Sequence, residues 1–270
     1  MPDASRLSLN QATTQHWGMA DTIDGCARAG VGWIGLWRHK VAEIGIPETA
    51  RRVREAGLRV SSLCRGGFFP APTAEERRAR IEDNHKALDE AAALGTDVLV
   101  LVCGPAPDRD LDAAREMVFD GIAAMLPSAE QRGVRVAIEP LHPMFAGDRS
   151  VVVTLEQAND MAERLASPWV GVAVDVYHVW WDPCVYQEIA RARGRILGFH
   201  VSDWLVPPPD HLLGRGMMGD GVIELARLRQ AVDAAGYDGP IEVEIFNQKI
   251  WDTPGPEVLD LMKSRYFEHC

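Results

Sequence analysis

The chain has 270 residues, of which 47% are hydrophobic and 25% charged, and its formal net charge is −11. This is an ordinary composition for a protein that folds in water, and the length allows one or two domains. An acidic chain repels phosphate backbones, so we expect no nucleic-acid partner. We also expect no membrane partner, because no uninterrupted apolar run approaches the ~18 residues that span a bilayer.

The five cysteines are scattered over the chain and form no C-x-x-C pair. An odd, widely spaced set is typical of reduced thiols, not of a disulfide framework or a zinc knuckle. The first residues also lack the basic region and the apolar region of a signal peptide. Together these features predict a cytoplasmic protein.

Apolar, β-rich segments alternate with segments of helical composition along the whole chain. Several of the helical segments end at a glycine, as Ala74–Ala93 does shortly before Gly95. In chain order we predict strand Leu7–Asn10, helix Thr22–Ala29, strand Trp33–Trp37, helix Glu48–Glu55, strand Arg59–Cys64, helix Ala74–Ala93, strand Val98–Cys103, helix Asp112–Gln131, strand Val134–Glu139, helix Thr154–Leu165, strand Gly171–Asp175, helix Val185–Arg193, strand Ile196–His200, helix Leu225–Ala235 and strand Ile241–Ile245.

Strands that alternate with helices predict a parallel sheet, and eight strands are the number that closes a (β/α)8 TIM barrel. A doubly wound open sheet is the alternative. The barrel is favoured because polar residues at the ends of the last four strands would then share one face, whereas an open sheet would spread them along an edge. We therefore predict an α/β protein with a single barrel domain over residues 1–270.

Those polar residues are all able to bind a metal ion. Buried strands have little use for carboxylates or imidazoles unless their desolvation is compensated, and one divalent cation would compensate all four. Such a donor set suits Mn²⁺, Mg²⁺ or Co²⁺, and Zn²⁺ is also compatible with it. We predict one divalent metal ion, with Mn²⁺ preferred; the alternative is four separate, hydrogen-bonded structural groups. The predicted ligands are Glu139, Asp175, His200 and Glu244.

Glu242 competes with Glu244 for this role, because residues two apart on a strand share a face. We choose Glu244, which is closer to the rim, and keep Glu242 as a supporting group or salt-bridge partner. His142 and His178 each follow a predicted ligand by three residues, in what we expect to be rim loops. Either could bind substrate hydroxyls or carry protons, and the alternative is a histidine bonded to backbone. Asp203 is a candidate to orient His200, or else an exposed loop residue.

Two glycine-containing segments carry an arginine on the expected rim. Arg215 precedes a loop with three glycines and is a candidate clamp for a substrate carboxylate, phosphate or other oxygen. Arg65 is followed by two glycines and two phenylalanines, of which Phe68 is a candidate pocket wall, with core packing as the alternative. Trp204 lies in another rim loop and could stack on a sugar ring.

The same segments carry a family resemblance that covers essentially the whole chain. They resemble the xylose isomerase-like TIM-barrel superfamily, and within it the sugar phosphate isomerases and epimerases, which include ketose 3-epimerases, hydroxypyruvate isomerases and inosose dehydratases. The resemblance implies that Glu139 and Glu244 are both metal ligands and the acid/base pair, and that His178 binds substrate. It also allows for a homo-oligomer. The segments that carry it are Ala137–Leu141, Asp175–His178, His200–Asp203, Gly219–Ile223 and Val243–Phe246.

The chain departs from its relatives at two places. Ketose 3-epimerases have a substrate-binding arginine six residues after the ligand histidine, where this chain has Val206, and Arg215 is the candidate to replace it. The related AP endonucleases hold three zinc ions with additional histidines, whereas the third and fourth predicted strands end here in Cys64 and Cys103. A trinuclear nuclease is therefore not expected.

We thus predict a metal-dependent isomerase or epimerase of a small keto-sugar or polyol. The metal would bind a carbonyl and a neighbouring hydroxyl oxygen and stabilise an enediolate, while one of the two glutamates removes the α-proton and the other returns it. The alternative is a lyase at the same site, either a dehydratase or an enzyme that cleaves a glycosidic bond in an oxidised sugar. In both cases the expected partner is a small carbohydrate or glycoside. A barrel that only binds a sugar is the third hypothesis.

Overall fold

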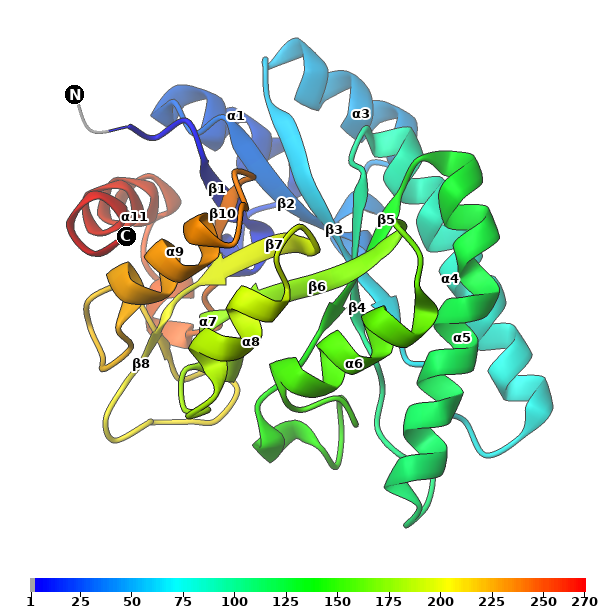
Figure 1. Cartoon of the computed structure of the whole chain (residues 1–270). Helices are drawn as coiled ribbons and strands as arrows, with labels where there is room; N and C mark the ends of the chain where they lie inside the picture. Colours follow the sequence, from blue (N-terminus) through cyan, green and yellow to red (C-terminus); the bar gives the residue numbers. More distant parts are fainter. Residues whose placement is uncertain (1–2) are drawn as a thin grey trace.

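Eight parallel strands close into a barrel in the computed structural model, which describes residues 3–270 (Figure 1). Around the barrel the order is β1-β10-β7-β6-β5-β4-β3-β2, so strands that are neighbours in sequence are also neighbours in space once the β8–β9 hairpin is set aside. The predicted (β/α)8 fold is confirmed. The barrel strands are β1 (Leu7–Asn10), β2 (Trp33–Trp37), β3 (Arg59–Gly67), β4 (Val98–Val102), β5 (Arg135–Glu139), β6 (Val170–Asp175), β7 (Ile196–Val201) and β10 (Ile241–Val243).

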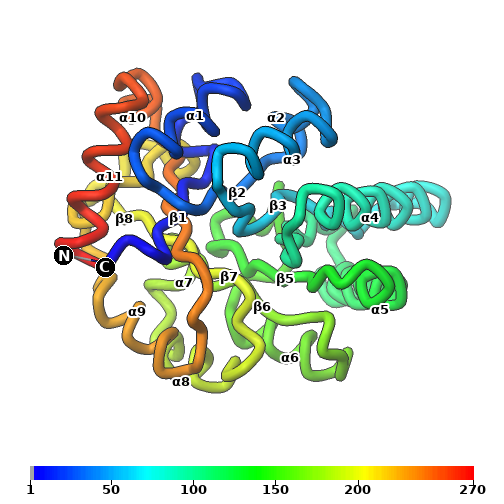
Figure 2. Tube along the Cα trace, turned by 90° about the horizontal axis from the view of Figure 1, so that it is seen from above, coloured from blue at the N-terminus to red at the C-terminus, as the bar shows by residue number. Residues whose placement is uncertain are grey.

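Helices surround the strands on the outside, as the view from above shows (Figure 2). The seven predicted helices are present, with ends that differ by a few residues. The last helix, α11, is not among the predictions and packs beside α1. The longer helices are α1 (Met19–Ala29), α3 (Ile46–Glu55), α4 (Ala74–Leu94), α5 (Leu111–Arg132), α6 (Leu155–Leu165), α8 (Val185–Arg191), α9 (Leu225–Ala234) and α11 (Gly255–His269).

One predicted strand end and two predicted loops need correction. Strand β3 does not stop at Cys64 but continues to Gly67, with a register shift against β4 between Cys64 and Gly66. His178 does not lie in a loop but in the short helix α7 (Val176–Val179). The long segment after β7 is not a simple loop, because β8 (Asp203–Trp204) and β9 (Arg215–Gly216) pair as an antiparallel hairpin.

The barrel interior is filled by small and branched side chains from four adjacent strands. Because side chains alternate along a strand, Ala137 and Glu139 share one face of β5, and Ala173 and Asp175 share one face of β6. The lower residues of each pair pack at the barrel axis. The carboxylates above them are therefore directed at the axis from the carboxyl end of the barrel, the end at which active sites of this fold lie. The interior cluster consists of Val98, Val100, Ala137, Ala173 and Leu197.

The largest apolar cluster lies between the strands and the surrounding helices. Helix ends are fixed by local bonds: Thr73 and Glu76 form a capping box before α4, and Gly95 ends that helix with φ of 81°. Among the described residues, no helix is both long and apolar enough to cross a membrane.

Candidate active site

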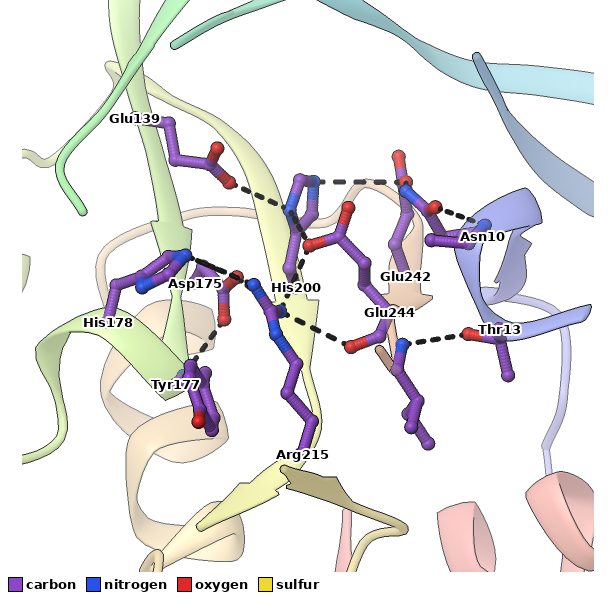
Figure 3. A network of polar contacts seen from close by, with 12 residues as sticks. Asn10, Thr13, Glu139, Asp175, Tyr177, His178, His200, Arg215, Glu242 and Glu244 are labelled. Atoms are coloured by element: carbon purple, nitrogen blue, oxygen red, sulfur yellow. Dashed lines mark hydrogen bonds and ion pairs between the residues drawn. The ribbon is translucent and has the colours of Figure 1, made fainter. Parts of the chain in front are cut away.

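The four predicted ligands meet at the carboxyl end of the barrel (Figure 3). Glu139 and Asp175 are the last residues of β5 and β6, His200 is the second-last residue of β7, and Glu244 directly follows β10. One ligand atom from each side chain can be chosen so that all four lie within 4.8 Å of one another. All four residues are buried, with between 0% and 5% of their surface exposed.

The donor atoms of this cluster are suited to a cation. Glu139 Oε1 and both ring nitrogens of His200 are buried and make no hydrogen bond within residues 3–270. His200 Nδ1 is 3.1 Å from Glu139 Oε1, but this contact lacks hydrogen-bond geometry. Buried polar atoms are almost always bonded, and a group left without a partner costs free energy. A metal ion bound among them would remove that cost, so these residues fit the predicted divalent ion.

Arg215 brings a fixed positive charge to the same cluster. Its Nη1 donates to Asp175 Oδ2 at 2.8 Å and to Glu244 Oε2 at 3.0 Å, and its Nη2 is 3.1 Å from His178 Nε2. The β8–β9 hairpin places it there, and Asn247 donates to its backbone carbonyl. Because a carboxylate oxygen has two lone pairs, these bonds leave both carboxylates able to bind a metal.

Burial and charge shift the pKa values of the cluster in different directions. Burial raises the pKa of Glu244 to about 8, against the opposing effect of Arg215 and His200. Burial also acts to raise the pKa of Asp175, but Arg215, His178, His200 and the Tyr177 N–H together hold that pKa below its ordinary value. Burial acts to lower the pKa of His200, yet Glu242, Glu139 and Glu244 raise it well above the usual range.

These shifts predict that metal binding expels protons. Without metal, Glu244 keeps its proton below about pH 8, and His200 is also protonated at neutral pH. Ligands must be deprotonated, so the affinity for Mn²⁺ should fall as the pH falls below 8, by about 10- to 100-fold per unit for one or two released protons. Calorimetric titration of the metal-free protein between pH 6 and 8, in buffers of different ionisation enthalpy, measures the affinity for Mn²⁺ and the number of protons released. An affinity that does not change over this range contradicts the prediction.

Residues of β1 and the turn after it hold the ligand strands in place. Asn10 Nδ2 donates to Glu242 Oε2, and that oxygen is 3.8 Å from His200 Nε2. Thr13 Oγ1 donates to the carbonyl of Val243 and accepts from the backbone N–H of Ile245, the two residues that flank Glu244. Glu242 is thus held by Asn10 below the imidazole, and Glu244 stays the proposed ligand.

Asp203 has a different role from either predicted one. It is buried, and its carboxylate accepts backbone N–H bonds from Trp204, Gly219, Gly221 and Ile223. It therefore fixes the segment after the β8–β9 hairpin and neither orients His200 nor lies exposed in a loop. Its fully occupied oxygens distinguish it from the unpaired groups of Glu139 and His200 in the candidate metal cluster.

His178 lies beside the cluster as a neutral side chain. Burial lowers its pKa to about 3, with Arg215 acting in the same direction against Asp175. Its Nδ1 accepts from the backbone N–H of His142 at 3.2 Å. A histidine that is neutral at pH 7 can hydrogen-bond a substrate hydroxyl, but it does not carry a proton as imidazolium.

The cluster opens into a cavity of about 570 Å³. Of the residues predicted to bind substrate, Arg65, Phe68, His178 and Arg215 line it. Phe69 does not, because its ring is buried against Gly121 on α5. The cavity is lined by Trp37, Arg38, His39, Cys64, Arg65, Gly66, Gly67, Phe68, Asp83, Val102, Glu139, Leu141, Phe145, Arg149, His178, Leu212, Arg215, Glu244 and Phe246.

His142 and Trp204 do not line this cavity. Their rings stack on each other with centroids 5.1 Å apart, and Trp204 also packs on Tyr177 and Trp180. His142 Nδ1 accepts the backbone N–H of Met144. The alternative interpretation of His142, a loop histidine bonded to backbone, agrees with this geometry, and Trp204 supports the wall behind His178.

Sequence reasoning missed several residues of the cavity. Phe246 is one of them, and it forms an edge-on ring pair with Trp37, the tryptophan that the sequence places at the end of the second strand, near the rim. Arg149 is another and reaches the cavity from the segment before α6. Phe246 lies two residues after Glu244, which is a spacing that could have identified it. Arg149 has no such signal, because only the folded chain brings it near Arg65.

The comparisons with known proteins agree with this geometry. A family model described as xylose isomerase-like TIM barrel matches residues 23–265. The chain belongs to this family. A crystal structure of a Sinorhizobium meliloti 1021 protein is 51% identical over 99% of both chains, with a TM-score of 0.97. An L-ribulose-5-phosphate 3-epimerase of Salmonella paratyphi A is 25% identical over 79% of this chain and 74% of its own.

A further solved structure extends the likeness in fold. The IolI protein, described with a bound zinc atom, has a TM-score of 0.86 at 18% identity and covers 97% of each chain. At this identity the likeness shows the fold alone. The epimerases and isomerases among the relatives nevertheless support an enzyme that acts on a small carbohydrate.

Proposed function

We propose that this protein is a divalent-metal-dependent isomerase or epimerase of a small keto-sugar or polyol. The observation that carries the proposal is the buried cluster of Glu139, Asp175, His200 and Glu244 at the floor of a sugar-sized cavity. Two of its carboxylates face the cavity, which a proton-transfer pair requires. The relationship to a ketose-phosphate epimerase supports the same reaction class.

The proposed reaction needs groups that transfer a proton and groups that bind the substrate, and the chain supplies both. When bound, a divalent ion supplies charge stabilisation for an enediolate oxygen. Glu139 and Glu244 lie on either side of His200 and would remove and return the α-proton. Arg215 and His178 would hydrogen-bond substrate oxygens, since both line the cavity beside the carboxylates. Arg215 would thereby replace the arginine that ketose 3-epimerases have where this chain has Val206.

We propose Mn²⁺ as the resident ion, because three carboxylates and one imidazole form an oxygen-rich donor set. The zinc described for IolI makes Zn²⁺ the competing choice. Elemental analysis of protein purified without added metal decides between them, since zinc at full occupancy would contradict the manganese proposal.

A lyase is the second candidate, and the cavity wall is the observation that favours it. Trp37, Phe68, Phe145 and Phe246 give the cavity an aromatic side that a substrate larger than a free sugar could use. The same glutamates would form the same enediolate, which would then expel a group from the β-carbon.

NMR spectroscopy in D₂O tests the proposal. The Mn²⁺-loaded protein, incubated with a panel of ketoses and ketose phosphates, should place solvent deuterium at the carbon next to the carbonyl in recovered sugar and form an isomer or epimer. Release of water or of an aglycone, without recovered isomer, would establish the lyase instead. No exchange and no release on any member of the panel would leave the sugar-binding hypothesis as the better one.

A further inference from the structure

The cavity carries a second group of charges, on the side formed by β3 and the segment before α6. Four arginines line the cavity. Arg215 is paired with Asp175 and Glu244 at the floor, and Arg38 is paired with Asp83 and Glu90 at the rim. The other two are Arg65 and Arg149, on the side of β3 and the segment before α6.

Neither of these two guanidinium groups hydrogen-bonds to a carboxylate among the described residues. Within residues 3–270, Arg65 makes no side-chain hydrogen bond and no ion pair, and it stacks over the ring of Phe68 with its Cζ 4.0 Å from the centroid. Arg149 has only its sequence neighbour Asp148, at 3.6 Å, and its Nε is buried without a hydrogen-bond partner. The buried Arg149 Nε is a donor without a partner, which is costly, whereas Arg65 is exposed and lines the cavity. A ligand with acceptor oxygens would satisfy both groups.

The chain holds both arginines in place before any ligand arrives. Arg65 sits at the register shift between β3 and β4, and bulges of this kind redirect side chains near active sites. Asn84 binds the backbone of Gly67, and Arg80 donates to the carbonyl of Phe68. These contacts fix the strand end that carries Arg65.

Arg149 is fixed in a similar way. The backbone N–H of Gly104 donates to the Arg149 carbonyl, and the Arg149 N–H donates to Phe145. Its guanidinium lies 5.6 Å from the centroid of the Phe145 ring, which also lines the cavity. A pair of arginines held on rigid backbone is a low-entropy site for an oxyanion.

The charges of the two sides of the cavity also differ. At the floor, Arg215 pairs with two of the carboxylates, and a bound divalent ion would balance the others. At the other side, Arg65 has no ion-pair partner among the described residues: burial lowers the pKa of Arg65, Arg149 and Arg38 lower it further, and Cys64 and Asp83 act against them. An anion bound there would relieve this repulsion, while the rest of a short substrate reaches the carboxylates in the same cavity.

We propose that Arg65 and Arg149 bind an anionic end group, so that the substrate is a keto-sugar that carries a phosphate ester or a carboxylate. This inference rests on the proposed function for the reacting end of the substrate. The contact chemistry is shared by the two anions, because a guanidinium group can donate to two oxygens of either one.

Matched substrates test the proposal. Deuterium exchange is measured with a neutral ketose, its terminal phosphate and the corresponding keto-acid with a terminal carboxylate. One of the two anions should have a kcat/KM at least about 10-fold above that of the neutral sugar, the gain expected for a charge-assisted contact, and the preferred one identifies the group. Equal values for all three substrates, or a preference for the neutral sugar, would overturn the inference.

Variants connect the preference to the two residues. In Arg65→Gln and Arg149→Gln, the ratio of kcat/KM between the anionic and the neutral substrate should fall by about 10- to 100-fold, mainly through KM. Arg54→Gln is the control, because Arg54 is exposed near the end of α3, away from the residues that line the cavity. If the ratio of kcat/KM between the anionic and the neutral substrate stays at the wild-type value in both variants, these arginines do not bind the anionic group.

A binding measurement keeps this inference separate from the proposed function. If no ketose exchanges deuterium, the proposed function fails, and inorganic phosphate and acetate can still be titrated calorimetrically into the metal-loaded protein. The Arg65→Gln/Arg149→Gln double variant should bind the preferred anion at least about 10-fold more weakly than the wild type and the Arg54→Gln control. Equal affinity in all three proteins would refute the anion site by itself.

Discussion

Glu139→Gln and Glu244→Gln should each lower the rate at which the substrate is converted into its epimer, the inversion rate, by about 10³-fold. This is the usual effect of losing a general acid or base. Glutamine keeps the shape and one oxygen donor but cannot accept the α-proton. Rates are compared at saturating Mn²⁺ and divided by the measured metal content, so that a weaker ligand is not counted as a lost base. Chiral chromatography of the products gives the inversion rate.

Deuterium exchange distinguishes the two glutamates from each other. If they act from opposite faces, Glu139→Gln should block exchange in one epimer and Glu244→Gln in the other, because the remaining base can still remove and return a proton on its own face. Glu224→Gln is the matched control, since Glu224 is exposed on the outside of the barrel and bonded to Arg227. Inversion at the wild-type rate in either active-site variant would remove that glutamate from the mechanism.

The fold was predictable because each strand and helix has a strong local signal. The apolar runs of β4 to β7 are buried on both faces, as parallel strands between helices must be, and their ends differ from the prediction by two residues at most. The extension of β3 was not predictable in this way. Gly66 and Gly67 read as a loop, but they pair with Leu101 and Val102 of β4. Glycine is needed at both positions because a Cβ there would meet α4 or β4 at under 3.0 Å.

The candidate metal ligands were predictable because their signal is local: each is a polar residue at the end of a buried strand. The surrounding residues depend on contacts across the chain. Arg215 is 40 residues from Asp175 and reaches it only through the β8–β9 hairpin. Trp204 and His142 are near the rim in sequence, but they turn toward each other instead of toward the cavity, and no spacing rule predicts that choice.

Asp175→Asn should reduce the affinity for the metal by more than about 100-fold, which exceeds the usual effect of changing a residue that only supports a ligand. Asp175 is fully buried, and its two oxygens accept from Tyr177 N–H and Arg215 Nη1. An amide offers one neutral oxygen, and its NH₂ group would oppose either Arg215 or the Tyr177 N–H. Elemental analysis after dialysis should then find wild-type protein loaded and the variant largely without metal.

Thermal unfolding gives a second readout of the same change. A metal at 100 times its dissociation constant stabilises the wild-type fold by about 2.7 kcal/mol, and the variant should gain little from the same Mn²⁺ concentration. Asp203→Asn is the matched control, because Asp203 is an equally buried aspartate that binds only backbone N–H groups. It should lose stability but keep its response to Mn²⁺. Full metal content in Asp175→Asn would refute the site, whereas equal metal loss in both variants would attribute the loss to misfolding.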